Sequence, residues 1–131
     1  MTEEKKEMLL TYIKENVAPI LVDFISGEDL VNAVVIPAGI DSSELVGHYE
    51  EADYKAPKWL ESILSDNLGK VLVIDKIDSI PKDEQTKFVE ILKYRQVSTF
   101  KLPENCVILV TADKVNESTI NEEIISLVAK I

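Results

Sequence analysis

Two uninterrupted apolar runs constrain this chain more than any other feature of its sequence. Residues 71–74 read Val-Leu-Val-Ile, and residues 106–110 read Cys-Val-Ile-Leu-Val. A strand with one face in solvent alternates apolar and polar residues, whereas a strand covered on both faces is apolar throughout. The two runs therefore predict buried strands of a parallel sheet with helices on both faces.

Helical patterns flank the two expected strands. Pro57 and Pro81 each stand where a helix would begin, because proline is well tolerated in the first turn of a helix. Residues 119–122, Thr-Ile-Asn-Glu, have the spacing of a capping box and predict the start of a last helix. The helix from Pro81 carries apolar residues at helical spacing, namely Phe88, Val89, Ile91 and Leu92.

A β-branched run at residues 32–37 predicts one more strand. Strands that alternate with helices imply right-handed crossovers and a parallel sheet. We therefore expect one α/β domain over residues 1–131, with a three-layer α/β/α arrangement and a short, mainly parallel sheet. The strands should lie in the order 32–37, 70–75 and 106–111, with residues 70–75 in the centre.

The N-terminal segment allows two interpretations. Apolar residues recur every three to four positions through residues 3–26, which favours one long helix. Pro19 would kink or end that helix. The alternative is a helix to about Asn16 followed by a strand over residues 20–25.

Charge and composition exclude several functional classes. The chain has 24 acidic and 14 basic residues, a net charge of −10. Phosphate backbones and anionic membrane surfaces attract basic proteins, so we expect neither nucleic-acid nor membrane binding. The single cysteine, Cys106, and the single histidine, His48, exclude an intramolecular disulfide and zinc sites that need several such residues. A charged N-terminus without a signal-peptide core predicts a cytoplasmic protein.

The segment from Lys70 to Asp113 resembles the second half of the nucleotide-binding core of AAA+ ATPases, especially the MoxR-like branch. Residues 71–75 (VLVID) resemble the Walker B strand, and residues 102–113 (LPENCVILVTAD) resemble the sensor 1 strand. Residues 81–96 (PKDEQTKFVEILKYRQ) resemble the helix that follows Walker B in the family. Upstream, IDSSELVGHY and APKWLESILSDNLGKV resemble the segment before Walker B, so the likeness covers roughly residues 30–115.

This resemblance implies a P-loop NTPase-like fold, with Asp75, Thr111 and Asp113 at the positions of a nucleotide and Mg²⁺ site. Several departures predict that the site is a relic. The sequence contains no Gly-x-x-x-x-Gly-Lys-Ser/Thr loop to cradle phosphates. Lys76 stands where active members carry a water-positioning glutamate, and Asp113 stands where they carry the sensor asparagine. The lid of the family is also expected to be missing, so the fold would be truncated.

The alignment to the family raises a question about the sheet edge. In AAA+ proteins the sensor 1 strand lies between the Walker A and Walker B strands. If residues 3–26 are the helix that follows the P-loop, the Walker A strand is absent and residues 106–111 form an exposed edge. Such an edge favours self-association or a protein partner by strand addition, unless a terminal helix covers it or a strand at residues 20–25 fills the gap.

We expect a non-catalytic AAA+-like domain that acts as a protein-binding or regulatory module without a cofactor or metal. The alternative is a partial ATPase component that completes a site for ATP and Mg²⁺ with a partner subunit. Cys106 is expected to pack inertly in the core. A polar segment with aromatic residues is the expected partner-binding patch, formed by Tyr49, Glu50, Glu51 and Tyr54.

Overall fold

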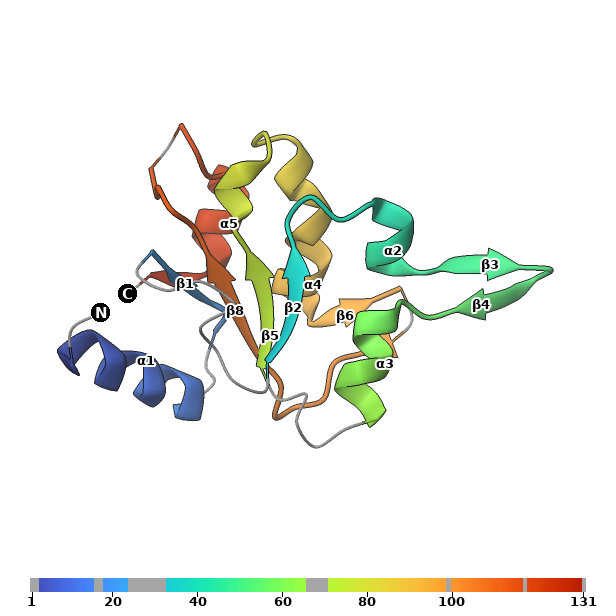
Figure 1. Cartoon of the computed structure of the whole chain (residues 1–131), viewed down its shortest axis with the longest axis horizontal. Helices are drawn as coiled ribbons and strands as arrows, with labels where there is room; N and C mark the ends of the chain where they lie inside the picture. The colour runs from blue at the N-terminus through green and yellow to red at the C-terminus, as the bar shows by residue number, and fades with distance from the viewer. Residues whose placement is uncertain are drawn as a thin grey trace.

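The computed structural model of the chain describes residues 3–15, 18–23, 33–65, 71–98, 100–116 and 118–130. A five-stranded sheet in the order β2-β5-β8-β1-β9 forms its centre (Figure 1), and neighbouring strands pair in parallel. The order β2-β5-β8 confirms the expected arrangement of three strands with β5 in the middle, while residues 32 and 70 of the expected strands lie outside the described residues. The strands are β1 (Ile20–Val22), β2 (Ala33–Pro37), β5 (Val71–Asp75), β8 (Val107–Thr111) and β9 (Ala129–Lys130).

The N-terminal segment follows the second interpretation, because α1 (Glu3–Glu15) ends before Pro19 and β1 begins directly after it. Ile20 pairs with Leu109, so β1 lies beside β8 on the side away from β5. The long-helix interpretation is wrong, and so is the expectation that residues 106–111 form an edge. Residues 24 and 25 of the expected strand lie outside the described residues. The position beside β8 is the one that the Walker A strand takes in AAA+ proteins.

Successive side chains of each strand point to opposite faces of the sheet, and on the central strands β5, β8 and β1 both sets are largely buried. One face packs on α2 (Ser42–Val46), α3 (Lys58–Ser65), α4 (Val89–Tyr94) and α5 (Glu122–Leu127). The other face packs on α1 through Leu9 and Ile13. The first core takes Leu21, Leu72, Ile74, Ile108 and Val110 from the strands, and the second takes Ile20, Val22, Val73, Val107 and Leu109.

Two helix starts differ from the sequence patterns. The segment after Pro81 begins as a 3₁₀ turn, η3 (Glu84–Phe88), which continues into α4. The capping box expected at residues 119–122 does not form, because Asn121 caps α5 and its Oδ1 accepts a 2.9 Å hydrogen bond from the Glu123 N–H. The Thr119 hydroxyl instead donates to the Lys114 carbonyl at 2.7 Å.

Two small hairpins complete the fold. The strands β3 (His48–Glu50) and β4 (Asp53–Lys55) form a hairpin that projects from the body of the domain at the end away from α1 (Figure 1). The strands β6 (Gln96–Val97) and β7 (Phe100–Lys101) form the other hairpin. Within the described ranges, no helix is long and apolar enough to cross a membrane.

Candidate functional site

The carboxyl ends of β5 and β8 bring Asp75 and Thr111 together. The buried Thr111 hydroxyl donates a 2.7 Å hydrogen bond to Oδ1 of Asp75 and accepts a 2.9 Å hydrogen bond from the Lys76 backbone N–H. Parallel α/β sheets place ligands at this edge, and the register of β5 with β8 fixes the two residues there. The two residues that the sequence places on neighbouring strands are therefore joined directly.

A short 3₁₀ turn, η2 (Ile77–Ser79), follows β5 and positions Asp78. Lys76 enters this turn in the left-handed conformation, with φ of 58°. The Asp78 carboxylate then accepts hydrogen bonds from the backbone N–H groups of Asp113, at 3.2 Å, and Lys114, at 2.9 Å. These amides would otherwise be available to an anion at the sheet edge. Asp78 thus fastens the loop after β8 to the turn after β5.

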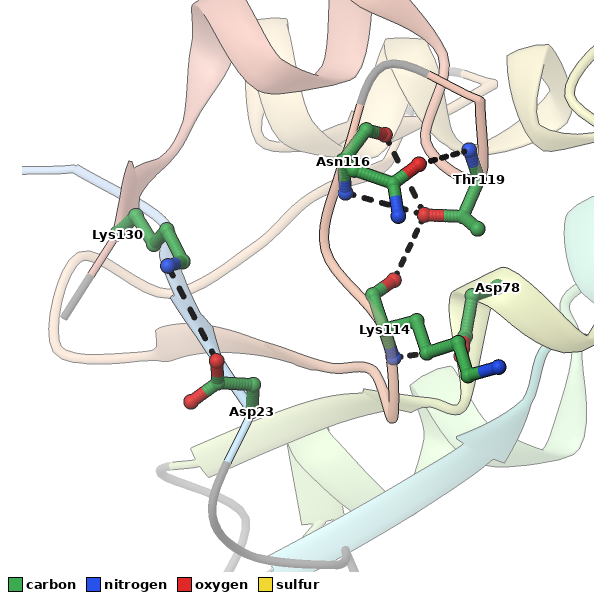
Figure 2. A network of polar contacts seen from close by, with 6 residues as sticks. All are labelled: Asp23, Asp78, Lys114, Asn116, Thr119 and Lys130. Carbon is green, nitrogen blue, oxygen red and sulfur yellow. Dashed lines mark hydrogen bonds and ion pairs between the residues drawn. The ribbon is translucent and has the colours of Figure 1, made fainter.

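The loop after β8 is closed by a second set of polar contacts, which Figure 2 shows beside Asp78. Oδ1 of Asn116 accepts hydrogen bonds from the backbone N–H groups of Ser118, at 2.8 Å, and Thr119, at 3.1 Å. The Asn116 N–H donates to the Thr119 hydroxyl at 3.1 Å. The side chain of Asn116 therefore organises this loop in the way of an Asx turn.

Gln85 is a buried polar residue, and the sequence patterns do not reveal its structural role. Its amide nitrogen donates to the carbonyl oxygens of Ile77, Ile80 and Thr119 at 2.8–3.2 Å. Its amide oxygen accepts a 2.7 Å hydrogen bond from the Asn121 N–H. Gln85 thereby ties the turn after β5 to the segment that enters α5. The resemblance includes this glutamine in a helix motif, but nothing in the local pattern marks it as buried.

Carboxylates gather where the central strands end. Asp23 follows β1, Asp75 ends β5 and Asp113 stands two residues after β8. The Asp23 carboxylate lies 3.9 Å from the Lys130 ammonium of β9, as Figure 2 shows. Lysines stand beside these carboxylates, namely Lys76, Lys114 and Lys130, so charges of both signs meet at this edge of the sheet.

Two of the backbone N–H groups at this edge are already occupied. A triphosphate needs free backbone N–H groups and cations, whereas the amides of Asp113 and Lys114 are already bonded to Asp78. Among the described residues, no group of three or more His, Cys, Asp or Glu side chains is placed to hold a metal ion. The backbone N–H groups of Asp113 and Lys114 are therefore not free to hold a phosphate group in this arrangement.

The expected partner-binding residues lie in the β3–β4 hairpin, but they do not share one face. Tyr49 pairs with Tyr54 across the strands, with ring centroids 5.3 Å apart, and Tyr49 is 69 % exposed. Tyr54 also stacks on Phe100 and donates from its hydroxyl to the Val46 carbonyl. Glu50 points to the opposite face, 3.1 Å from His48 Nε2, and Glu51 lies in the turn. The hairpin thus has an aromatic face and a charged face.

Cys106 lies fully buried just before β8. Burial raises the pKa of the Cys106 thiol, although the positive charge of Arg95 opposes that shift. The thiol is therefore held in its unreactive protonated form. The Arg95 side chain donates hydrogen bonds to the carbonyl oxygens of Cys106 and Pro103 and so stabilises the segment that leads into β8.

Comparisons with known proteins show the fold. No family model matches the chain, and no curated protein matches it. Among solved structures, that of a "putative ATPase" from Cytophaga hutchinsonii superposes with a TM-score of 0.63 at 16 % identity. The match covers 98 % of this chain but 45 % of that protein. At this identity the likeness shows a shared α/β fold, and it shows nothing about activity.

Proposed function

We propose that this domain is a non-catalytic, AAA+-like module that binds a protein partner or regulates one. The observation that carries the proposal is that the Asp78 carboxylate already binds the backbone N–H groups of Asp113 and Lys114 at the carboxyl edge of the sheet, so these groups are not free to hold a phosphate. Asp23, Asp75 and Asp113 stand at or just beyond the ends of β1, β5 and β8, where nucleotide-binding α/β proteins place phosphate groups. The sequence after β1, DFISGEDLVN, adds acidic residues and has no lysine at that point.

Two further features support a module that does not turn over ATP. Lys76 follows Asp75 directly, and a lysine that keeps its proton cannot act as a general base toward water. The Asp75 carboxylate accepts the Thr111 hydroxyl, which gives it a structural task at the junction of β5 and β8. Under this proposal Asp75, Thr111 and Asp113 are the remnants of an ancestral nucleotide site.

The alternative is a partial ATPase component that shares a nucleotide site with a partner subunit. Asp75 is only half-buried, so the residue is not fully closed off from solvent. In that case ATP and Mg²⁺ would approach the same sheet edge, with the phosphate-binding loop supplied by the partner.

A titration of the protein with ATP and Mg²⁺, followed by amide NMR, separates the two. The proposal expects no saturable shift at Asp75, Thr111 or Asp113 and no release of phosphate. Saturable shifts at those amides, lost in Asp75→Ala and kept in Asp53→Ala, would instead establish a nucleotide site. Asp53 suits the control because it is an exposed carboxylate in the distant hairpin.

A further inference from the structure

The strand β2 forms an edge of the sheet within the described part of the chain. Its sequence, AVVIP, contains no charged residue. Natural edge strands are commonly protected by lysine, proline or a bulge, since an open edge can pair with another chain. Here the protection is limited to Pro37 at the end of the strand, and Val35 in its middle is 41 % exposed.

The hydrogen-bond alternation of a parallel pair decides which backbone groups of β2 are available. Ala38 N–H donates to the Asp75 carbonyl at 3.0 Å. Residues of β2 that lie an even number of positions from Ala38 therefore direct their backbone N–H and C=O groups toward β5. Val35 lies an odd number of positions from Ala38, so its N–H and C=O groups point away from β5, to the outer side of the sheet. The edge therefore presents a donor and an acceptor at Val35, next to an exposed apolar side chain.

A groove runs beside this edge, between β2, α2 and α3, with a cavity volume of about 630 Å³. Its apolar wall includes Ile36, Ile40 and the indole ring of Trp59. The Trp59 side chain is held by a 2.8 Å hydrogen bond from its indole N–H to the Leu45 carbonyl, which joins α3 to α2. The wall is therefore preformed, which reduces the ordering cost of binding.

The rim of the groove is acidic on balance. Glu44 of α2 and Glu61 of α3 line it, with Lys58 as the one lysine among the lining residues and His48 at the start of the hairpin. The whole chain carries a net charge of −10. Like charges at this level oppose a second copy of the chain and favour a cationic partner.

We propose that the β2 edge and its groove bind an extended segment of a partner protein in which apolar residues alternate with lysine or arginine. The segment adds a strand to β2 through the outward N–H and C=O of Val35. Side chains of an extended strand alternate with a period of two. The lysine or arginine side chains lie on the α2–α3 side of the sheet, where their aliphatic stems cover the apolar wall of the groove and their charged ends reach Glu44 and Glu61. The apolar side chains lie on the opposite side, beside Val35, which pairs with Val73 of the core that faces α1. This inference rests on the proposed function of the domain as a protein-binding module.

The test uses a capped peptide of alternating lysine and valine, about nine residues long, which is enough to span β2. Trp59 is the only tryptophan of the chain and lies in the groove wall, so its fluorescence reports occupancy. We expect a saturable change in Trp59 emission and slower hydrogen exchange at the Val35 amide. The matching glutamate-valine peptide should bind at least about tenfold more weakly, a difference of about 1.4 kcal/mol.

Two pairs of variants examine the two parts of the proposal. Val35→Pro removes the outward N–H and should weaken binding about tenfold, whereas Val35→Thr keeps that N–H and should bind nearly as the unaltered protein does. Glu44→Lys should weaken binding of the lysine peptide severalfold. Glu4→Lys on α1 makes the same change in net charge far from the groove and should leave binding unchanged. The Glu44→Lys pair decides the matter if Val35→Pro proves unfolded by circular dichroism.

Three results would overturn the inference: no saturable binding of the lysine peptide, equal binding of both peptides, or equal weakening by Glu44→Lys and Glu4→Lys. A dimer by sedimentation that Val35→Pro abolishes would show that the edge serves a second copy instead. Failure of the proposed function appears elsewhere, as ATP-dependent shifts at Asp75 and Thr111. The peptide and nucleotide titrations therefore fail independently of each other.

Discussion

The Thr111 hydroxyl and the Asp75 carboxylate form a 2.7 Å hydrogen bond across residues that lie 36 apart in the sequence. The same hydroxyl accepts the Lys76 N–H, so it joins the ends of β5 and β8 with both its donor and its acceptor. Thr111 is 1 % exposed, and a buried hydroxyl with two partners is costly to remove. The carboxyl edge of this sheet is therefore held by two of the residues that the resemblance places at a nucleotide site.

Replacing Thr111 with valine should lower the free energy of unfolding by about 1–3 kcal/mol. Valine keeps the shape of threonine but leaves the Lys76 N–H without its acceptor and the Asp75 carboxylate without that donor. Urea denaturation of both proteins measures the difference.

Thr86→Val is the matched control for this substitution. The Thr86 hydroxyl also donates a 2.7 Å hydrogen bond, to the Asp83 carbonyl, but it lies on the exposed surface of η3. Water can replace that bond, so we expect a change within about 0.5 kcal/mol. Equal losses in Thr111→Val and Thr86→Val would show that burial of the Thr111 hydroxyl has no special effect.

Gln85→Leu should be more damaging, with a loss of about 2–4 kcal/mol. The leucine side chain would leave three carbonyl oxygens and the Asn121 N–H without the partner that Gln85 supplies. Thermal unfolding followed by circular dichroism measures the loss. Gln96→Leu provides the comparison, because the half-buried Gln96 amide makes one long contact of 3.4 Å to the Ser98 carbonyl. A Gln85→Leu protein as stable as the Gln96→Leu protein would contradict the interpretation of Gln85 as a clamp.

The sequence was sufficient to predict the central sheet but not its full width. Continuous apolar runs identify β5 and β8 because both faces of these strands are buried. β1 and β9 have three and two residues, too few for a period to be visible. The helical pattern of apolar residues before β1 continues into it, and Pro19 is the single residue that interrupts it. The sequence therefore leaves helix and strand open, and the pairing of Ile20 with Leu109 in the structure shows the strand.

The β3–β4 hairpin could not be predicted from its turn. Hairpins with two-residue turns usually carry Asn-Gly or a similar pair, because both central residues need a positive φ. Here Glu51 and Ala52 occupy those positions, with φ of 49° and 76°. The candidate site shows the same limit: the strand ends place Asp75 and Thr111 together, but the bonds from Asp78 to the loop after β8 depend on the turn geometry at Lys76.

Gly47 tests the attachment of this hairpin. Its φ of 86° and ψ of −173° are open almost exclusively to glycine, and a Cβ added there would lie 2.4 Å from the Lys55 carbonyl oxygen. Gly47→Ala should therefore cost about 2 kcal/mol or more and should shift the ring resonances of Tyr49 and Tyr54. Gly39→Ala is the control, since a Cβ at Gly39 meets nothing within 4 Å. Equal stability of the two variants would contradict the strain assigned to Gly47.

Cys106 offers a direct measure of how firmly the core is closed. Burial raises the pKa of its thiol, so at pH 8 the reactive thiolate is scarcer in the folded protein than in the unfolded chain. Its fully buried position also requires the fold to open before a reagent can reach the sulfur. We expect a disulfide reagent such as DTNB to label the folded protein at least about a hundredfold more slowly than the denatured protein. Raising the pH from 7 to 8 should speed labelling of the denatured chain by increasing its thiolate fraction.

The control for this measurement is an added surface thiol. Ser43 is exposed on α2, so Ser43→Cys should supply one thiol that reacts at once while Cys106 still reacts slowly. Rapid reaction of Cys106 in the folded protein would mean that β8 is accessible to solvent on the time scale of labelling. Because β8 pairs with both β5 and β1, that result would also contradict its placement in the interior of the sheet.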